Sequence, residues 1–387
     1  MDGSIQAREN KKGQKVYDVL YRVEDPRTGK KKQMLKRGFK TKKEAQEFLV
    51  GIQNKILTGS YVSPDNLTLK DYLKDWLKVY AEPNLKPATI DGYRNNIERH
   101  IIPCIGHIPL QKLKAANIQE FYALKLKGDE EGNNALSGKS VVYIHRVLSQ
   151  ALKHALNKQL IPRNVANEVT PPKIKKFKSE VYDVTEIQKL LDIAKNTAME
   201  VPVTLAALLG LRRGEVLGLK WDRVDFKNKT VIIDRQLSKS SKGPLLDSTK
   251  TESSNRDIPI SDNIVKLLKS QKKKQLQDKL LLGNEYNDNN FVVCRINGDL
   301  ISPDAFSHDF AQFLKDNNLK HIRFHDLRHS YATMMLAHGE SIHVTSKLMG
   351  HSSIKVTGDI YAHILDDVKR RASDNIDKLI FNSAKNK

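Results

Sequence analysis

The sequence predicts a multidomain fold in which a small β-sheet plus helix module precedes an all-α domain and an α+β domain. The chain of 387 residues is longer than a single hydrophobic core usually supports. Its apolar residues alternate near the N-terminus, then recur at helical spacing, and finally show both patterns. Residues 171–178 place two helix-breaking prolines beside four lysines, which is typical of an extended linker. We therefore expect domains at residues 1–62, 67–167 and 181–387, with a basic linker at 171–180.

The N-terminal module is predicted from extended runs followed by a helix. Alternating apolar residues at 15–23 predict a strand, and turn residues at 25–29 separate this strand from a second extended run at 32–39. The two runs form a β-hairpin. Thr41 and Glu44 form a T-x-x-E capping box that opens the helix. We expect a three-stranded sheet with one helix packed on it.

The same module is strongly basic. Residues 1–60 contain 15 Lys and Arg against 7 Asp and Glu. This balance favours DNA binding, with Lys36 and Arg37 as candidate contacts, although a solvated charged face would also explain it.

The region from residue 67 to 167 is predicted to be all-α. Thr68 is the expected N-cap of a helix on which Leu69, Tyr72, Leu73 and Trp76 form one apolar stripe. Further helices are expected at 90–101, 117–126 and 140–156. Candidates for phosphate contacts here and in the linker are Lys86, Arg94, Arg99, Lys139, Arg146, Lys153, Lys175 and Lys176. Ordinary surface charge explains each of these residues equally well when it is taken alone.

Composition narrows the classes of partner. The net charge of +21 favours nucleic acid or an anionic membrane surface. No apolar run approaches the roughly 18 residues that cross a bilayer, and the N-terminus lacks the apolar stretch of a signal peptide. We therefore expect a cytoplasmic protein whose partner is nucleic acid. Cys104 and Cys294 are far apart and outside any paired motif, so neither a disulfide framework nor a zinc site is expected.

Two segments of the last domain carry candidate cations for phosphate chemistry. Arg212 follows Gly210 at a tight helix junction, where a guanidinium can be held rigidly with its fork towards two phosphate oxygens. Glu215 is placed to anchor this arginine, although a surface arginine pair at a helix start is an equally good explanation of the segment alone. Lys250 lies at the tip of a polar turn between strands, and its ammonium is a candidate to protonate a leaving 5′ oxygen. A turn lysine taken alone is usually inert surface.

A third segment opens a helix that is predicted to stop at Gly339. His325 and Arg328 are three residues apart and therefore neighbours on one helix face. A proton-transfer group beside a guanidinium suits a crowded phosphorane transition state. His325 and His329 also have the spacing of two zinc ligands, but Asp326 stands where the H-E-x-x-H motif has glutamate.

The fourth segment contains a candidate nucleophile. Gly350 permits a turn that presents His351, and Tyr361 follows on a short helical stretch. A tyrosine with an ordinary pKa near 10 is a weak nucleophile at neutral pH. Two adjacent guanidiniums and a basic neighbour would stabilise its phenolate. Taken alone, such a tyrosine is usually a packing residue.

In this order, the four segments resemble the tyrosine recombinase (phage integrase) family. The pattern of that family is an early arginine, a hairpin lysine, H-x-x-R, G-H and a late tyrosine. The resemblance implies that Arg212 and Arg328 clamp the scissile phosphate. It also implies that His325 and Lys250 serve proton transfer.

The resemblance further implies roles for the two remaining positions. His351 would donate to a phosphate oxygen, and Tyr361 would attack phosphorus to give a 3′-phosphotyrosyl intermediate and a free 5′ hydroxyl. Because the covalent bond conserves the phosphodiester energy, neither ATP nor a metal cofactor is expected. Met349 stands where leucine is more frequent in the family, which is a change in packing only.

The rest of the chain resembles the same family less specifically. Residues 67–167 are similar to the helical domain that binds core sites on DNA, and residues 1–62 to the arm-binding module of integrases from mobile elements. The implied partners are double-stranded DNA, three further copies in a tetramer, and accessory DNA-bending and excision factors. The implied setting is the nucleoid of a bacterium. The apolar residues of a predicted C-terminal helix pack either on a neighbouring subunit or in cis; these are Ile376, Leu379, Ile380 and Phe381.

Two other functions fit parts of the sequence. A DNA-relaxing enzyme resembling type IB topoisomerases would use the same residue types without exchanging partners. A non-catalytic architectural protein would explain the charge and the helical domain, but not the combination of Arg212, Lys250, His325, His351 and Tyr361. The arm module favours recombination that integrates and excises a phage or another mobile element.

Overall fold

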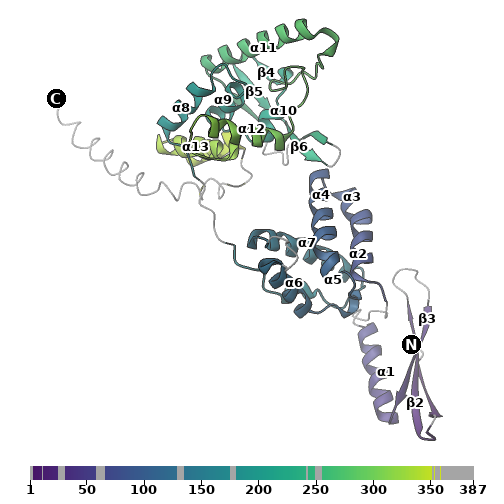
Figure 1. The fold of residues 1–387 in the computed structure, drawn as a ribbon. Helices are drawn as coiled ribbons and strands as arrows, with labels where there is room; N and C mark the ends of the chain where they lie inside the picture. The colour runs from purple at the N-terminus through teal and green to yellow at the C-terminus, as the bar shows by residue number, and fades with distance from the viewer. Residues whose placement is uncertain are drawn as a thin grey trace, which may run out of the picture. The chain divides into compact units, whose positions relative to one another are not determined.

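The computed structural model describes residues 3–10, 12–24, 31–57, 66–128, 135–174, 180–240, 243–248 and 255–350, together with residues 353 and 358. The chain divides into two compact units, Met1–Lys176 and Phe177–Lys387 (Figure 1). Several residues singled out from the sequence lie outside the described residues, namely Lys175, Lys176, Lys250, His351, Tyr361, Ile376, Leu379, Ile380 and Phe381.

The first part of the N-terminal unit is a three-stranded antiparallel sheet with a helix along one face (Figure 1). The elements are β1 (Gly3–Glu9), β2 (Lys15–Glu24), β3 (Lys31–Phe39) and α1 (Lys42–Leu57). Val19, Tyr21 and Val23 of β2 are buried in one cluster with Ala45 and Leu49 of α1. Alternation along the strand therefore separates a face covered by the helix from an open face.

The predicted capping box opens α1. The backbone N–H of Glu44 donates to Thr41 Oγ1 (3.2 Å), and the backbone N–H of Thr41 donates to Glu44 Oε2 (3.3 Å). These two bonds satisfy backbone donors that the first helical turn would leave unpaired.

The second part of the N-terminal unit is all-α, as the sequence predicts. Its longer helices are α2 (Leu69–Trp76), α4 (Pro87–Asn96), α6 (Ala115–Lys127) and α7 (Gly138–Asn157), and its shorter ones are α3 (Glu82–Asn84) and α5 (Ile102–Ile105). Thr68 caps α2 by accepting from the N–H of Asp71. Leu69, Tyr72, Leu73 and Trp76 are all buried in the core of this part.

Two continuous helices of this part, α2 with α3 and α4 with α5, each contain a π-helical turn between their two segments. The wide turns are Leu77–Ala81, which precedes Pro83, and Ile97–Ile101, which precedes Pro103. A proline ring clashes with the carbonyl four residues earlier. A wider turn relieves that clash and lets the helix continue.

The C-terminal unit is α+β. Its helices are α8 (Val184–Ala194), α9 (Glu200–Leu209), α10 (Arg213–Gly218), α11 (Asp262–Leu282), α12 (Pro303–Asp316), α13 (Phe324–Ala337) and α14 (Ile342–Met349). Its strands are β4 (Val224–Asp225), β5 (Thr230–Ile233), β6 (Arg235–Ser240), β7 (Gly243–Ser248) and β8 (Arg256–Pro259). One sheet has the order β4-β5-β8, and β6 pairs with β7 in a separate ribbon.

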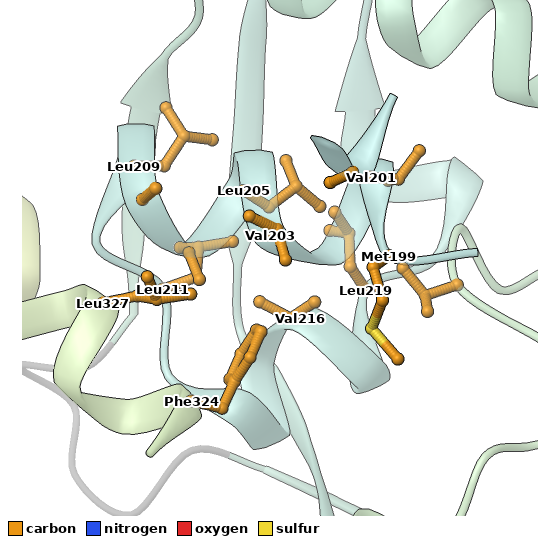
Figure 2. Close-up of a cluster of buried hydrophobic side chains, with 14 of the residues drawn as sticks. Met199, Val201, Val203, Leu205, Leu209, Leu211, Val216, Leu219, Phe324 and Leu327 are labelled. Carbon is orange, nitrogen blue, oxygen red and sulfur yellow. The ribbon is translucent and has the colours of Figure 1, made fainter. Parts of the chain in front are cut away.

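Helix α9 lies at the centre of this unit. Apolar residues on all its sides are buried, as expected of a helix inside a core. Figure 2 shows Val203, Leu205 and Leu209 of α9 in one buried cluster with Leu211, Val216 and, from α13, Phe324 and Leu327. The core therefore fixes the two helix ends that carry Arg212 and Arg328.

The chain passes from one sheet to the other at Asp234. β5 ends at Ile233 and β6 begins at Arg235, and the two strands belong to different sheets. Asp234 accepts from Arg223 Nε (2.7 Å) and from Arg235 Nε (3.0 Å). These contacts hold the chain where it passes from one sheet to the other.

Within the described part of the chain, no helix combines the length and the apolar character that a membrane crossing needs.

Candidate active site

The site begins at the junction of α9 and α10. Gly210 ends α9 in the left-handed conformation (φ 64°), which L side chains rarely adopt. A Cβ at this position would meet Tyr331 Cδ1 at 2.5 Å, so both the backbone angle and the space require glycine. Arg212 is the N-cap residue of α10. Its backbone is therefore fixed by the turn, as the sequence predicts.

Glu215 holds Arg212 in place. Arg212 Nη1 donates to Glu215 Oε1 (2.6 Å), and the backbone N–H of Arg212 donates to Oε2 (2.9 Å). The Glu215 side chain is only 1 % exposed. Burial on its own raises the pKa of this carboxyl, but the hydrogen bond and charge of Arg256 and then the charge of Arg212 outweigh it, so its pKa lies below the ordinary value. Glu215 is ionised at neutral pH and anchors Arg212, as predicted.

Arg328 lies on the inner side of α13 and is 1 % exposed. Its Nη1 donates to Gly210 O (2.6 Å) and its Nη2 to Met349 O (2.5 Å). Burial, and then the nearby charge of Arg212, lower the pKa of Arg328 to about 9. The guanidinium is still protonated at neutral pH, in surroundings that strengthen its field.

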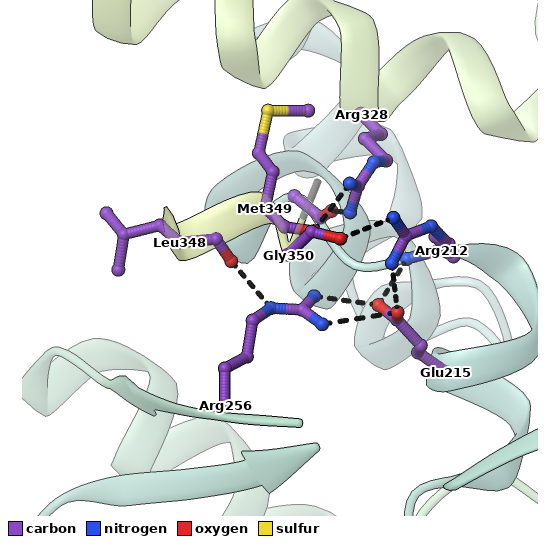
Figure 3. A network of polar contacts seen from close by, with 8 residues as sticks. Arg212, Glu215, Arg256, Arg328, Leu348, Met349 and Gly350 are labelled. Atoms are coloured by element: carbon purple, nitrogen blue, oxygen red, sulfur yellow. Dashed lines mark hydrogen bonds and ion pairs between the residues drawn. The ribbon is translucent and has the colours of Figure 1, made fainter. Parts of the chain in front are cut away.

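Helix α14 ends at this cluster. Gly350 is its C-cap, in the left-handed conformation (φ 63°). Figure 3 shows three guanidiniums meeting the end of this helix. Arg256 Nε donates to Leu348 O (2.7 Å), and Arg212 Nη2 donates to Gly350 O (2.8 Å), while Arg328 donates to the carbonyl between them. Because His351 directly follows Gly350, the cluster fixes the point from which the segment with His351 and Tyr361 starts.

His325 lies in the first turn of α13, with its side chain exposed. Its ring lies edge-on to that of His329, with the ring centroids 5.0 Å apart. Partial desolvation, followed by the charges of His329 and Arg328, lowers the pKa of His325 to about 4. The imidazole is therefore neutral near pH 7. Among the described residues, no group of three or more His, Cys, Asp and Glu side chains is placed to hold a metal ion.

Known protein families match along most of the chain. The profile of the phage integrase family matches residues 180–367. The N-terminal SAM-like domain of phage integrases matches residues 68–125, and an arm DNA-binding domain matches residues 6–56. The chain belongs to the phage integrase family. It is thus a site-specific DNA recombinase of the tyrosine type.

Relatives of this recombinase align with most of its length. A tyrosine recombinase XerC-like protein of Caldanaerobacter subterraneus subsp. tengcongensis is 27 % identical over 394 residues, which cover 95 % of this chain and 97 % of the relative. The ICEBs1 integrase of Bacillus subtilis is 26 % identical over 308 residues, or 78 % of this chain and 80 % of that protein.

Solved structures share the fold. The integrase of transposon Tn1549, in complex with a circular intermediate DNA, superposes with a TM-score of 0.66 at 20 % identity, covering 80 % of this chain and 99 % of that one. A lambda integrase tetramer bound to a Holliday junction gives a TM-score of 0.57 at 19 % identity, covering 90 % and 95 %.

The structure brings together some of the residues that the sequence singled out in this recombinase. Arg212, Glu215 and Arg328 meet around the end of α14, and His325 is close enough to Arg212 and Arg328 for their charges to lower its pKa. Lys250, His351 and Tyr361 lie outside the described residues. The strands on either side of Lys250, β7 and β8, belong to different sheets, which alternation in the sequence does not reveal.

One residue of the cluster was missed by sequence reasoning. Arg256 is buried (7 % exposed) and contacts both Glu215 and the end of α14. The sequence shows it only as an arginine at the start of a strand. The signal that could have found it is the alternation along β8, which puts Arg256 on the same inward side as the buried Ile258. A charged residue at an inward position needs a partner.

The candidate DNA contacts of the N-terminal unit are spread over its surface. Arg146 and Lys153 of α7 are exposed, and Lys86 caps α4. Arg94 is paired with Glu82 (3.0 Å) and Asp91 (3.2 Å). Arg99 and Lys139 are also exposed.

On the sheet, the strand register places the two candidate DNA contacts Lys36 and Arg37 on opposite faces. Lys36 pairs with Val19, whose side chain packs under α1. Arg37 instead lies near Asp18 on the open face, with Nε 4.0 Å from Oδ2, because neighbouring residues of a strand point to opposite sides.

Proposed function

We propose that this recombinase integrates and excises a mobile element by breaking and rejoining DNA through a covalent bond between Tyr361 and a backbone phosphate. One observation carries the proposal. Arg212, Arg256 and Arg328 gather around a single carboxylate, Glu215, and the bonds of Arg328 described above go to carbonyls. A buried surplus of positive charge is costly unless an anion completes it. A phosphate of the DNA backbone supplies that anion.

The two arginines of the family pattern stabilise the reacting phosphate. The Arg212 side chain is 29 % exposed, so its guanidinium can donate to a phosphate oxygen while Glu215 holds it from behind. Arg328 supplies a second fixed charge beside it. Five N–H donors on each guanidinium allow protein and phosphate contacts at once. Donors that are fixed before the reaction stabilise developing charge without reorganising.

Proton transfers complete the step. The phenol oxygen of Tyr361 forms a bond to phosphorus while the bond from phosphorus to the 5′ oxygen breaks. The neutral imidazole of His325 accepts the phenol proton, and the ammonium of Lys250 gives a proton to the leaving 5′ oxygen. His351 donates to a phosphate oxygen. Rejoining is the reverse sequence, with a 5′ hydroxyl as the attacking group.

The N-terminal unit supplies DNA affinity. The open face of its sheet carries one arginine from each strand, namely Arg8 of β1, Arg22 of β2 and Arg37 of β3. This face binds arm sites. Arg146 and Lys153 on the helical part contact phosphates at core sites, as do Lys175 and Lys176 of the linker. Lambda integrase forms a tetramer on a Holliday junction. By analogy, four copies of this chain assemble on DNA in the bacterial nucleoid, assisted by accessory bending and excision factors.

The test is covalent capture. The full-length protein is mixed with a library of nicked duplexes of random sequence, in which cleavage releases a short strand that cannot be rejoined. After denaturation, the DNA that stays on the protein is sequenced, and the modified peptide is identified by mass spectrometry. We expect the adduct on Tyr361, with a common DNA sequence that gives the site and the cleavage position.

Other outcomes select the alternatives. No covalent complex with the wild-type chain would favour the architectural protein. A complex that persists in Tyr361→Phe would place the nucleophile elsewhere. Relaxation of a supercoiled plasmid that carries two captured sites, with no recombinant product, would favour a DNA-relaxing enzyme.

A further inference from the structure

The three last carbonyls of α14 each accept from a different arginine. Leu348 O accepts from Arg256 of β8, Met349 O from Arg328 of α13, and Gly350 O from Arg212 at the start of α10 (Figure 3). Carbonyls at a helix C-terminus lack intrahelical partners, and guanidiniums favour the negative end of the helix dipole. Arg212 and Arg328 belong to the proposed phosphate site. Arg256 is the third arginine at this helix end, and the proposed function gives it no role of its own.

Arg256 grips Glu215 with both ends of its fork. Its Nη1 lies 3.2 Å from Oε1 and its Nη2 lies 2.8 Å from Oε2. Both partners are almost fully buried, at 7 % and 1 % exposure. The same two oxygens accept from Arg212, Oε1 from the guanidinium and Oε2 from the backbone N–H. Arg256 therefore fixes the carboxylate of Glu215, and the same carboxylate fixes Arg212.

We propose that Arg256 is a positioning residue of the recombination reaction, which fixes Glu215 and the end of α14 so that Arg212 meets the phosphate in one geometry. The inference rests on the proposed function. Arg256 acts through its neighbours, since Glu215 and Leu348 O take up the fork and the Nε donor. Strand β8 begins at Arg256. This side chain thereby ties β8 to α10, which follows Arg212, and to the end of α14.

Lysine cannot replace arginine in this role. Its ammonium is a compact charge that reaches one carboxylate oxygen or one carbonyl, whereas the planar fork of arginine holds two oxygens and leaves Nε for a third. Arg256→Lys thus keeps the positive charge and removes the geometry. Misplacement of a reacting group by about 1 Å costs on the order of 100-fold in rate.

The experiment measures cleavage by full-length variants on a nicked duplex that carries the site captured with wild-type protein. With protein in excess and DNA saturated, the single-turnover rate constant does not depend on the fraction of active molecules. We expect Arg256→Lys to lower this rate constant about 10- to 100-fold, with the Kd for the same DNA within about twofold of wild type. Arg223→Lys is the matched control, because Arg223 also holds a carboxylate, with its Nε 2.7 Å from Asp234 Oδ2, but lies outside the cluster. It should cleave at the wild-type rate.

A double-mutant cycle separates positioning from plain stability. If Arg256 acts through Arg212, then Arg256→Lys lowers the rate further by less than about threefold once Arg212→Lys is present, because the arginine to be positioned is gone. A merely stabilising Arg256 would shift the midpoint of thermal unfolding and leave the wild-type rate constant. Arg256→Gln, which is shorter and neutral but keeps an N–H donor, serves as the second variant if the lysine variant unfolds.

The outcomes distinguish the two proposals. Wild-type protein that forms no covalent complex would overturn both. Wild-type protein that cleaves, with Arg256→Lys as fast as Arg223→Lys, would overturn only the role of Arg256. Rate losses that multiply in the double variant would also overturn it, since Arg256 would then act independently of Arg212.

Discussion

The basic residues of the two units differ in how they are held. In the N-terminal unit, Arg146 and Lys153 stand exposed on a helix surface. In the C-terminal unit, Arg256 and Arg328 are buried, and each is fixed by at least two partners from other parts of the chain. An exposed cation adds a small, salt-sensitive increment to affinity. A buried and fixed guanidinium acts on one anion in one geometry.

This difference predicts two kinds of mutational response. Substitutions in the buried cluster should change the rate of chemistry or the stability of the fold by large factors and leave DNA affinity nearly intact. Substitutions on the N-terminal surface should change affinity by small, additive steps and leave the rate on bound DNA intact. The following experiments test the contrast, from the largest expected effect to the smallest.

Tyr361→Phe should abolish the covalent complex completely, because the phenyl ring has no oxygen to attack phosphorus. Affinity for the captured DNA site should stay within about twofold of wild type if phosphate contacts elsewhere dominate binding. The measurement is a denaturing gel of protein bound to a nicked duplex, beside a gel-shift titration. A large loss of affinity would mean that Tyr361 contributes to DNA binding as well as to chemistry, which would contradict the contrast between the two units.

Arg328→Lys should lower the cleavage rate about 10²- to 10³-fold, the usual cost of losing one fixed donor to a developing oxyanion. The charge stays, but a single ammonium cannot reach both Gly210 O and a second acceptor. Single-turnover cleavage at saturating DNA gives the rate, and thermal unfolding confirms the fold. A rate within threefold of wild type would contradict the assignment of Arg328.

Glu215→Gln should destabilise the C-terminal unit by about 3 kcal/mol, because removing a buried partner leaves guanidiniums uncompensated. The effect depends on pH with a definite sign. The folded-state pKa of Glu215 lies below its ordinary value of 4.5, so its stabilisation is fully present above pH 4.5 and is lost as the pH falls through the folded pKa.

Denaturant unfolding of wild type and Glu215→Gln at several pH values checks this. The gap in unfolding free energy should be constant from pH 5 to 7 and should narrow in acid. A gap that widens as the pH falls would mean that Glu215 is not held as a carboxylate.

Lys153→Gln should weaken DNA binding only a few-fold and reduce the slope of log Kd against log salt concentration by about 1. Wild-type binding itself should depend steeply on salt. The rate of cleavage once DNA is saturated should not change. If the slope of log Kd against log salt concentration equals that of the wild type, Lys153 does not contact DNA phosphates.

The outcome of the sequence predictions differs between local and distant features. The capping box of Thr41 and Glu44, the Thr68 cap, the stop of α13 before Gly339 and the anchoring of Arg212 by Glu215 are all confirmed. Each depends on residues within a few positions of one another. Local hydrogen bonds and turn conformations are nearly independent of the rest of the fold.

Features that join distant segments were harder to foresee. The break at Asp234 depends on Arg223 and Arg235, and the burial of Arg256 depends on α10 and α14. Lys36 and Arg37 are adjacent in sequence, yet the strand register places them on opposite faces. Helical or alternating spacing cannot show which strand becomes a neighbour.

The sequence by itself determined the order of the modules, the family pattern and the residue types available to act on a phosphate. These follow from composition, periodicity and motif spacing, which are properties of the linear chain. Only the tertiary structure decided that the arginines of α10, β8 and α13 converge on the end of α14 around Glu215. Convergence depends on how the buried α9 core orients elements that are far apart in the chain, and on burial that leaves each guanidinium dependent on its fixed partners.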